Sequence, residues 1–237
     1  MKILAIESSA VSASAAITDG SKIIASSYVN VKLPHSQTLM PMIRSALDSS
    51  LTDINSIDAI AVSCGPGSFT GIRIGISAAK GLAVPKDLPC LAVSTLYCMA
   101  QNFAGSDCIV CAVMDARCNQ VYNALFRING LAIERLCDDR ALLCDDLVCE
   151  LQKYKDKNIV ICGDGADMFI KYVSKFSNIK IAPEHLKYQN AVGVALCGYE
   201  MLKSGKTVSK EELLPVYLRL PQAERELKAK KQKLQEL

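Results

Sequence analysis

The chain has 237 residues, of which 50% are hydrophobic and 22% are charged, and its net charge is only +3. This composition excludes a disordered chain, a collagen-like chain and a small scaffold held together by disulfides. The small net charge does not indicate charge-dominated binding to nucleic acid and leaves open only a local basic patch. Aromatic residues make up 5% of the chain, so stacking on single-stranded nucleic acid is not expected to be its main activity.

The eleven cysteines predict a reduced, cytoplasmic protein, because extracellular disulfide scaffolds are short and carry even numbers of cysteines. Cys108 and Cys111 have the spacing of a metal or redox pair, but their apolar surroundings indicate a buried strand, so we interpret them as core thiols. Glu7 interrupts the apolar N-terminus, which does not fit a signal peptide. No uncharged apolar run in the sequence is long enough to span a membrane, so no membrane is expected among the partners.

The first half of the chain begins with a predicted meander of three strands, at 2–7, 12–18 and 23–31. Apolar residues at helical spacing then predict a helix from His35 to Ser49. The remaining predicted elements are a buried strand at 57–63, a helix ending near Val84, a strand at 90–93 and a helix at 95–103.

The second half repeats this order. Extended stretches at 108–115, 120–127 and 131–136 predict a second meander, and an acidic residue ends the first strand of each meander. The predicted elements that follow are a helix at 145–153, a strand at 158–162, a Gly-Asp-Gly turn, a helix, a strand at 180–182 and a helix at 191–202. Identity between the halves is poor, so coincidental alternation is the alternative to a duplicated unit.

A duplicated unit of this kind resembles the α/β plan of the actin, Hsp70 and hexokinase superfamily, whose halves are RNase H-like. The resemblance implies two lobes, each with a mixed sheet and flanking helices. We expect an N-terminal lobe over 1–105, a C-terminal lobe over 106–212, and a C-terminal helix over 213–237 that returns to the first lobe.

The same resemblance implies a vestigial nucleotide site between the lobes. Its candidate residues are Glu7 and Asp115, the strand-end acids, and Gly163 and Gly165 of the Gly-Asp-Gly turn. The alternative interpretation is that both acids are ordinary turn residues at strand ends.

The segment Gly65–Gly75 reads GPGSFTGIRIG and is the most informative stretch of the sequence. Its glycines allow positive φ and close approach of the backbone, and the N–H groups at the start of the following helix can bind an anion. The spacing does not fit a P-loop. A tight turn between strand and helix and a phosphate cradle therefore both remain open.

The helix over 71–84 carries two apolar stripes, one through Ile72 and Ile76 and one through Ile74 and Ala78. A helix that is apolar on two sides must be covered on two sides, so we expect this helix and the helix at 35–49 to meet another chain. Complete burial within the chain is the alternative, and the wheel does not tell which stripe faces out. The expected interface residues are His35, Leu39, Ile43, Arg73, Ile74, Ile76, Ser77 and Lys80.

Several stretches together resemble the TsaB (YeaZ) family from residue 1 to about residue 222. They read MKILAIESSAVSASAAI, HSQTLMPMI, IDAIAVSCGPGSFTGIRIGISAAKGLA, LAVSTLYCMAQ, AVMDARCNQVY and LLPVYLRLPQAE. The resemblance implies a partner of TsaD and TsaE in threonylcarbamoyl transfer to the adenosine 3′ of the anticodon in tRNAs that read ANN codons. It also implies a homodimer when TsaD is absent, contact with tRNA only through the complex, and ATP or ADP at or near the TsaD interface.

The related TsaD carries a metal-binding pair of histidines, which maps onto Thr95 and Met99 here. Neither residue is a plausible ligand for a hard cation or iron. We therefore expect no catalytic residue, no metal site and no cofactor of the chain's own, which predicts a non-catalytic scaffold. The rival hypotheses are a stand-alone ATPase or kinase of the actin-like superfamily and, with less support, a metallopeptidase. The C-terminal tail is either a solvated helix or a contact for tRNA or a partner.

Overall fold

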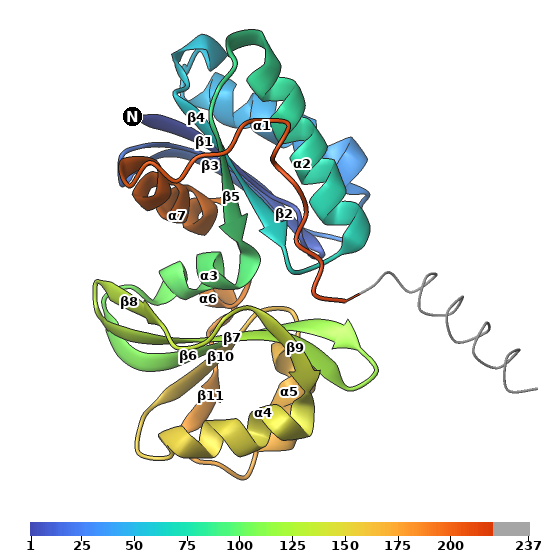
Figure 1. Ribbon diagram of the computed structural model, residues 1–237, viewed down its shortest axis with the longest axis vertical. Coiled ribbons are helices and arrows are strands. Elements are labelled where there is room, and N and C mark those ends of the chain that lie inside the picture. Colours follow the sequence, from blue (N-terminus) through green and yellow to red (C-terminus); the bar gives the residue numbers. More distant parts are fainter. Residues whose placement is uncertain (220–237) are drawn as a thin grey trace, which may run out of the picture.

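The computed structural model describes residues 1–219, and most of the helix predicted over 213–237 lies outside this range. Two lobes follow one another along the chain, and each is built on a mixed β-sheet (Figure 1). None of the helices within residues 1–219 is long and apolar enough to cross a membrane.

The first sheet has the strand order β3-β2-β1-β4-β5. Its strands are β1 (Lys2–Glu7), β2 (Ser12–Asp19), β3 (Lys22–Asn30), β4 (Ala59–Gly65) and β5 (Cys90–Ser94). β1, β2 and β3 form an antiparallel meander, whereas β4 and β5 continue the sheet parallel to β1. The helices α1 (His35–Ser49) and α2 (Phe69–Ala83) cover one face, and their apolar sides form a core cluster with it.

The second sheet has the order β11-β10-β6-β7-β8, and β9 pairs with β7. Its strands are β6 (Ser106–Arg117), β7 (Gln120–Gly130), β8 (Ala132–Arg135), β9 (Arg140–Leu143), β10 (Ile159–Cys162) and β11 (Ile179–Ile181). The helices α4 (Cys144–Leu151) and α5 (Ala166–Val173) pack with the outer face of this sheet in a separate cluster.

The two sheets share one topology, because a three-stranded meander is followed in each by two strands parallel to its first strand. This confirms the predicted duplication and the two-lobed α/β fold. The sequence analysis missed β9 and the short helix α6 (Glu184–Lys187), which lies in a stretch that reads as a loop. Single 3₁₀ turns lie at Ile54–Ser56, Val84–Lys86, Gln101–Phe103 and Gln152–Tyr154.

Two helices connect the lobes. α3 (Thr95–Ala100) contacts strands of both sheets, β4 and β5 of the first and β6 and β7 of the second. α7 (Ala191–Lys203) follows the second sheet in the sequence but packs on β1, β2, β4 and β5 of the first (Figure 1). The prediction that residues 106–212 form the C-terminal lobe is therefore wrong for α7, which packs on the first sheet. Small residues make this packing close, because a Cβ on Gly198 would lie less than 3.0 Å from Ala61. One core cluster consequently runs through both lobes.

The segment 204–219 after α7 runs along the first lobe, and residues 213–219 form neither a helix nor a strand. The rest of the helix predicted over 213–237 lies outside the described residues. Val208 pairs with Cys90 at the edge of the sheet, and Leu213 is buried in the α1/α2 core. The backbone N–H of Val216 donates to the carbonyl of Cys64 at 2.7 Å. These contacts fasten residues 208–216 to the first lobe.

Candidate functional site

A hollow of about 400 Å³ lies between the lobes, at the ends of β1 and β6, and is called the interlobe cleft here. Its lining residues are Ser9, Ala10, Val11, Gly67, Ser68, Phe69, Met114, Asp115, Ala116, Arg117, Tyr122, Asp164, Tyr217 and Arg219. This is where the resemblance to the actin-like superfamily implies a nucleotide. Of the four residues expected there, only Asp115 lines the cleft.

Glu7 is fully buried and does not face the cleft. Its carboxylate accepts a hydrogen bond from the backbone N–H of Ser9 at 2.6 Å and another from the hydroxyl of Ser63. The thiol of Cys98 lies 3.8 Å from the same carboxylate. Burial raises the pKa of Glu7, and the hydrogen bonds from Ser63 and Ser9 oppose that shift. The side chain therefore organises the end of β1 internally and is not available to a ligand.

Asp115 lies at the rim of the cleft, and its side chain is 34% exposed. It accepts from the backbone N–H of Arg117 at 2.7 Å and pairs with the guanidinium of the same residue at 3.3 Å. This pattern is the turn role that the alternative interpretation gave to the strand-end acids.

Asp164 was not among the predicted site residues, although it lies between Gly163 and Gly165. It lines the interlobe cleft, and its Oδ1 atom is buried without a hydrogen-bond partner among residues 1–219. Burial, and then the charge of Asp115, raises the pKa of Asp164 to about 6. A carboxyl group with a buried, unpartnered oxygen is costly to ionise. The hydroxyl of Ser9, which also lines the cleft, is a second buried polar group without a partner among residues 1–219.

Gly163 and Gly165 pack against β6 and leave no space for a phosphate. A Cβ on Gly163 would lie less than 3.0 Å from the carbonyl of Val113, and one on Gly165 would touch the backbone of Met114. The N–H of Gly163 donates to the carbonyl of Lys187 at 2.6 Å, and that of Gly165 donates to Val113 at 3.2 Å. Both groups that could bind an anion are already used within the protein.

The Gly65–Gly75 motif is likewise closed by its own chain. A Cβ on Gly67 or Gly71 would lie less than 3.0 Å from the carbonyl of Ser9 or Ser8, respectively. The hydroxyl of Ser8 donates to the carbonyl of Gly71 at 2.9 Å, and the N–H of Ser68 donates to Ser9 at 2.6 Å. The glycines therefore serve a tight turn that seals the loop after β1, rather than a phosphate cradle.

The positions of the missing histidine pair lie inside the protein. Thr95 and Met99 are fully buried on α3, and Met99 belongs to the core cluster that joins the lobes. Within residues 1–219, no group of three or more His, Cys, Asp or Glu side chains could hold a metal ion.

The outer side of α1 and α2 carries a second hollow, of about 610 Å³. We call it the α1/α2 patch, and it is lined by Met40, Phe69, Thr70, Arg73, Ile74, Ser77 and Ala78. The stripe of α2 through Ile72 and Ile76 is buried against the sheet, whereas Ile74 and Ala78 face outward and stay partly exposed. The structure thus decides which stripe is available, a point that the helical wheel leaves open.

The expected interface residues divide into two groups. Leu39, Ile43 and Ile76 are at most 5% exposed and belong to the first lobe's core, so their expected contact with a partner is wrong. They fill the layer between helix and sheet, which a partner does not reach.

Arg73, Ile74 and Ser77 line the α1/α2 patch. His35 is partly buried, with Nε2 2.6 Å from the carbonyl of Ala10, which is a local structural role. Lys80 is also partly buried, and its Nζ lies 3.5 Å from the carbonyl of Glu211.

An aromatic cluster separates the α1/α2 patch from the interlobe cleft. The ring of Phe69 stacks on Tyr217 at a centroid distance of 5.0 Å, and the guanidinium of Arg73 lies 3.8 Å from the Phe69 centroid. Arg73 also donates to the Tyr217 hydroxyl at 2.7 Å. Phe69 lines both hollows, so the extended segment after α7 holds the border between them.

Comparison with known proteins gives the family. Residues 29–227 match the family described as "TsaD: tRNA N6-adenosine threonylcarbamoyltransferase". The chain is 33% identical over 222 residues to the "tRNA threonylcarbamoyladenosine biosynthesis protein TsaB" of Escherichia coli, covering 92% of this chain and 95% of that protein. The chain belongs to the TsaB family. The Bacillus subtilis TsaB is similar at 32% over 229 residues, covering 94% and 96% of the two chains.

A solved structure agrees with this membership. The structure titled "YeaZ from Pseudomonas aeruginosa" is 28% identical to this TsaB-family chain and superposes with a TM-score of 0.74, covering 92% of this chain and 99% of that one. The two-lobed fold is therefore the fold of the TsaB/YeaZ family. The 29–227 match also relates this TsaB-family chain to the threonylcarbamoyltransferase TsaD.

Proposed function

We propose that this chain is a non-catalytic scaffold subunit in the formation of threonylcarbamoyladenosine on tRNA in the cytoplasm. In this role it binds TsaD through the α1/α2 patch, and TsaE joins the complex that TsaD and this chain form. The family membership supports the pathway, because the relatives from E. coli and B. subtilis are described as threonylcarbamoyladenosine biosynthesis proteins.

The outward stripe of α2 is the observation that carries the proposal. Ile74 and Ala78 line a hollow on the surface beside Met40, which is 47% exposed. Apolar surface left in water costs about 25 cal/mol for each Å². Clusters of exposed apolar side chains with a polar rim are typical of sites for protein partners. Arg73, Thr70 and Ser77 supply such a rim here.

The internal hydrogen bonds beside the interlobe cleft support a scaffold rather than an enzyme. The alternative, a stand-alone ATPase or kinase, needs free N–H groups and carboxylates that face a phosphate chain. Gly163 and Gly165 donate within the protein, and Glu7 is buried. Asp115 and Asp164 are the cleft features that the alternative can still use. On the scaffold proposal, any ATP or ADP binds at the TsaD interface instead.

The proposal predicts that Ile74→Arg weakens binding of the organism's own TsaD about thirty-fold or more, which is the size of a central interface residue. Ile23→Arg is the matched control, because Ile23 lies on β3 and is 50% exposed. Binding is measured by titration calorimetry, and circular dichroism verifies the fold of each variant. If Ile74→Arg folds and binds TsaD as tightly as Ile23→Arg does, the interface lies elsewhere.

The same surface should also join two copies of the chain when TsaD is absent, because a two-fold homodimer uses one patch on both copies. TsaD should then dissolve the homodimer as it is added, and an apolar contact should resist salt. Size exclusion with light scattering measures the mass of the homodimer as TsaD is added and as the salt concentration is raised. A complex in which TsaD binds an intact homodimer through the α1/α2 patch would overturn the competition.

A further inference from the structure

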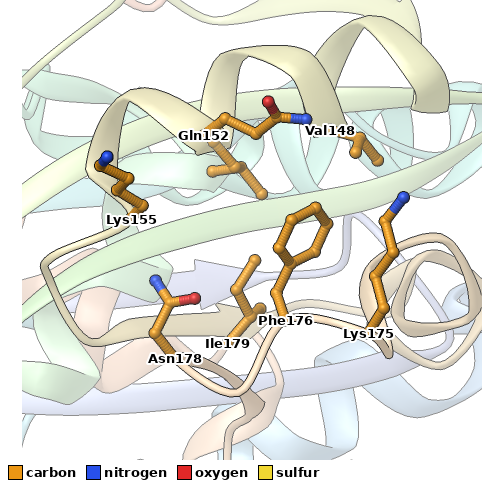
Figure 2. Close-up of a pocket in the computed structure, with 8 residues that line it drawn as sticks. Val148, Gln152, Lys155, Lys175, Phe176, Asn178 and Ile179 are labelled. Atoms are coloured by element: carbon orange, nitrogen blue, oxygen red, sulfur yellow. The ribbon is translucent and has the colours of Figure 1, made fainter.

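A groove of about 470 Å³ on the second lobe belongs neither to the interlobe cleft nor to the α1/α2 patch. It lies between the end of α4 and the segment that joins α5 to β11, and it is called the α4/β11 groove here. Its lining residues are Val148, Leu151, Gln152, Lys155, Lys175, Phe176, Asn178 and Ile179. Figure 2 shows the Phe176 ring between Gln152 and Lys175, with Lys155 at the other end.

The chemistry of this lining is an apolar floor with a basic rim. Leu151 and Ile179 are buried beneath it, whereas Phe176 is only partly buried. The Nζ of Lys175 lies 5.3 Å from the centroid of the Phe176 ring. Gln152 is exposed, so its amide is available to a ligand. No carboxylate lines the groove.

Hydrogen bonds connect the segment after α4 with the segment before β11, the two walls of the groove. The side-chain amide of Asn178 donates to the carbonyl of Lys157 at 2.9 Å and to that of Tyr154 at 3.4 Å. The N–H of Ile159 donates to the carbonyl of Asn178 at 2.9 Å, which fixes this tie to the sheet. The α4/β11 groove is therefore formed before any ligand arrives, which reduces the entropy lost on binding.

Basic residues gather on the segments that follow α4 and α5 and on β11, whereas α4 itself carries Asp145, Asp146 and Glu150. The exposed lysines are Lys153, Lys155, Lys157, Lys171, Lys175 and Lys180. None of them forms an ion pair with another residue of the part of the chain that the structure describes.

The nearby acids have other surroundings. Glu150 pairs with Arg140 at 2.7 Å, Asp167 pairs with Lys187 at 2.7 Å, and Asp156 lines a different hollow. Asp145 and Asp146 are exposed in the first turn of α4 but do not line the groove, whose charged lining residues are Lys155 and Lys175. The lining of the groove is therefore net positive.

We infer that the α4/β11 groove binds an unpaired nucleotide of RNA, with its base against Phe176 and the neighbouring phosphates on Lys155 and Lys175. An aromatic ring beside lysines, with an amide to reach base edges, is the chemistry by which proteins hold single-stranded RNA. The exposed lysines on the segments beside the groove favour a chain of phosphates over the few carboxylates of a peptide. The choice of tRNA as the RNA rests on the proposed function.

The test is a titration of the full chain with a fluorescent anticodon stem-loop RNA, followed by anisotropy at several salt concentrations. Lys155→Gln combined with Lys175→Gln should reduce the slope of log affinity against log salt by about 1.4, because each phosphate contact to a single strand contributes about 0.7. The control pair Lys22→Gln and Lys206→Gln removes two exposed lysines elsewhere and should leave that slope unchanged.

The variant Phe176→Leu tests whether the groove binds a nucleic-acid base or an apolar side chain of a peptide. Loss of stacking should weaken RNA binding about tenfold, whereas Phe176→Tyr keeps an aromatic ring and should restore it. Thermal unfolding of both variants verifies that the lobe stays folded. If Phe176→Leu binds the RNA like wild type, or a peptide of alternating Glu and Leu binds more tightly than the RNA, the inference is overturned.

The two proposals fail separately. The groove variants should bind TsaD like wild type, and Ile74→Arg should bind the RNA like wild type. If TsaD binds no form of the chain, the scaffold proposal fails whatever the RNA result. If TsaD binds but the lysine pair leaves the RNA salt slope unchanged, only the groove inference fails.

Discussion

The interlobe cleft lies at the N-terminal end of α2 and the α1/α2 patch lies along the outer side of the same helix, and they differ in how far the chain itself covers them. At the cleft, Gly67 and Gly71 bring the start of α2 against the loop after β1, and the backbone groups there bond to one another. At the patch, Ile74 and Ala78 of the same helix remain partly exposed around an open hollow.

This difference distinguishes a site for catalysis from a site for a protein partner. A site for chemistry needs polar groups that are free and directed at a ligand, whereas a partner site needs apolar surface that is left unsatisfied. The cleft has little of the first property: among residues 1–219, its buried polar atoms without a partner are those of Ser9 and Asp164. The patch has the second property. The comparison therefore supports a binding subunit rather than an enzyme.

The largest expected effect distinguishes two glycines of α2. Gly71→Ala should lower the free energy of unfolding by about 3 kcal/mol, because its Cβ would overlap the carbonyl of Ser8. Gly81→Ala should raise it by about 0.5 to 1 kcal/mol, because that position is open and alanine favours a helix. Urea unfolding compares the two. Similar stabilities for both variants would mean that the motif does not seal the cleft.

The next effect concerns the ionisation of Asp164. Its pKa of about 6 in the folded protein lies above its ordinary value of 3.8, so the folded state holds the proton more strongly than the unfolded state. The free energy of unfolding should therefore fall as pH rises from about 4 to about 6. Asp164→Asn removes this titration, so its stability relative to wild type should rise by about 2 kcal/mol between pH 4 and pH 7.

Unfolding of both proteins in urea at a series of pH values checks this prediction. A difference that stays constant from pH 4 to pH 7 would show that the cleft holds the ionised carboxylate without penalty. The cleft would then be better prepared for a cation than its packing indicates.

The smallest effect lies at the border between the two regions. Tyr217→Phe removes the hydrogen bond from Arg73 but keeps the stacking on Phe69, and should cost about 0.5 kcal/mol because the pair is exposed. Tyr217→Ala also removes the stacked ring and should cost about 1 kcal/mol more. Equal stabilities for the two variants would mean that the ring does not secure the extended segment to α2.

The sequence predicted the fold well because its signals are local. Alternating strands and helical spacing, repeated in both halves, are sufficient for the order of elements and the duplication. The place of α7 was wrong, because an apolar helix pattern does not tell which sheet the helix covers. The partner of α7 is set by the fit of Gly198 against Ala61, two residues far apart in the sequence.

The candidate site was harder to predict for a similar reason. The sequence does not show whether the N–H of a glycine binds a phosphate or, as at Gly163, a carbonyl of the protein. Positions 74 and 76 are both isoleucine on α2, and only the packing of the helix against the sheet decides which of them is exposed to a partner. The surroundings of Asp164 include residues of the first lobe, such as Ser9 and Gly67, that are far from it in the sequence, so no local pattern marks it.

The central claim is that this chain serves threonylcarbamoyl transfer through its surface and not through its cleft. The most direct measurement is transfer to tRNA in a reconstituted mixture with TsaD and TsaE, comparing Asp115→Asn in the cleft with Ile74→Arg in the α1/α2 patch. We expect Asp115→Asn to sustain transfer near the wild-type rate and Ile74→Arg to lower it at least about tenfold. Loss of transfer with Asp115→Asn and its retention with Ile74→Arg would contradict the account.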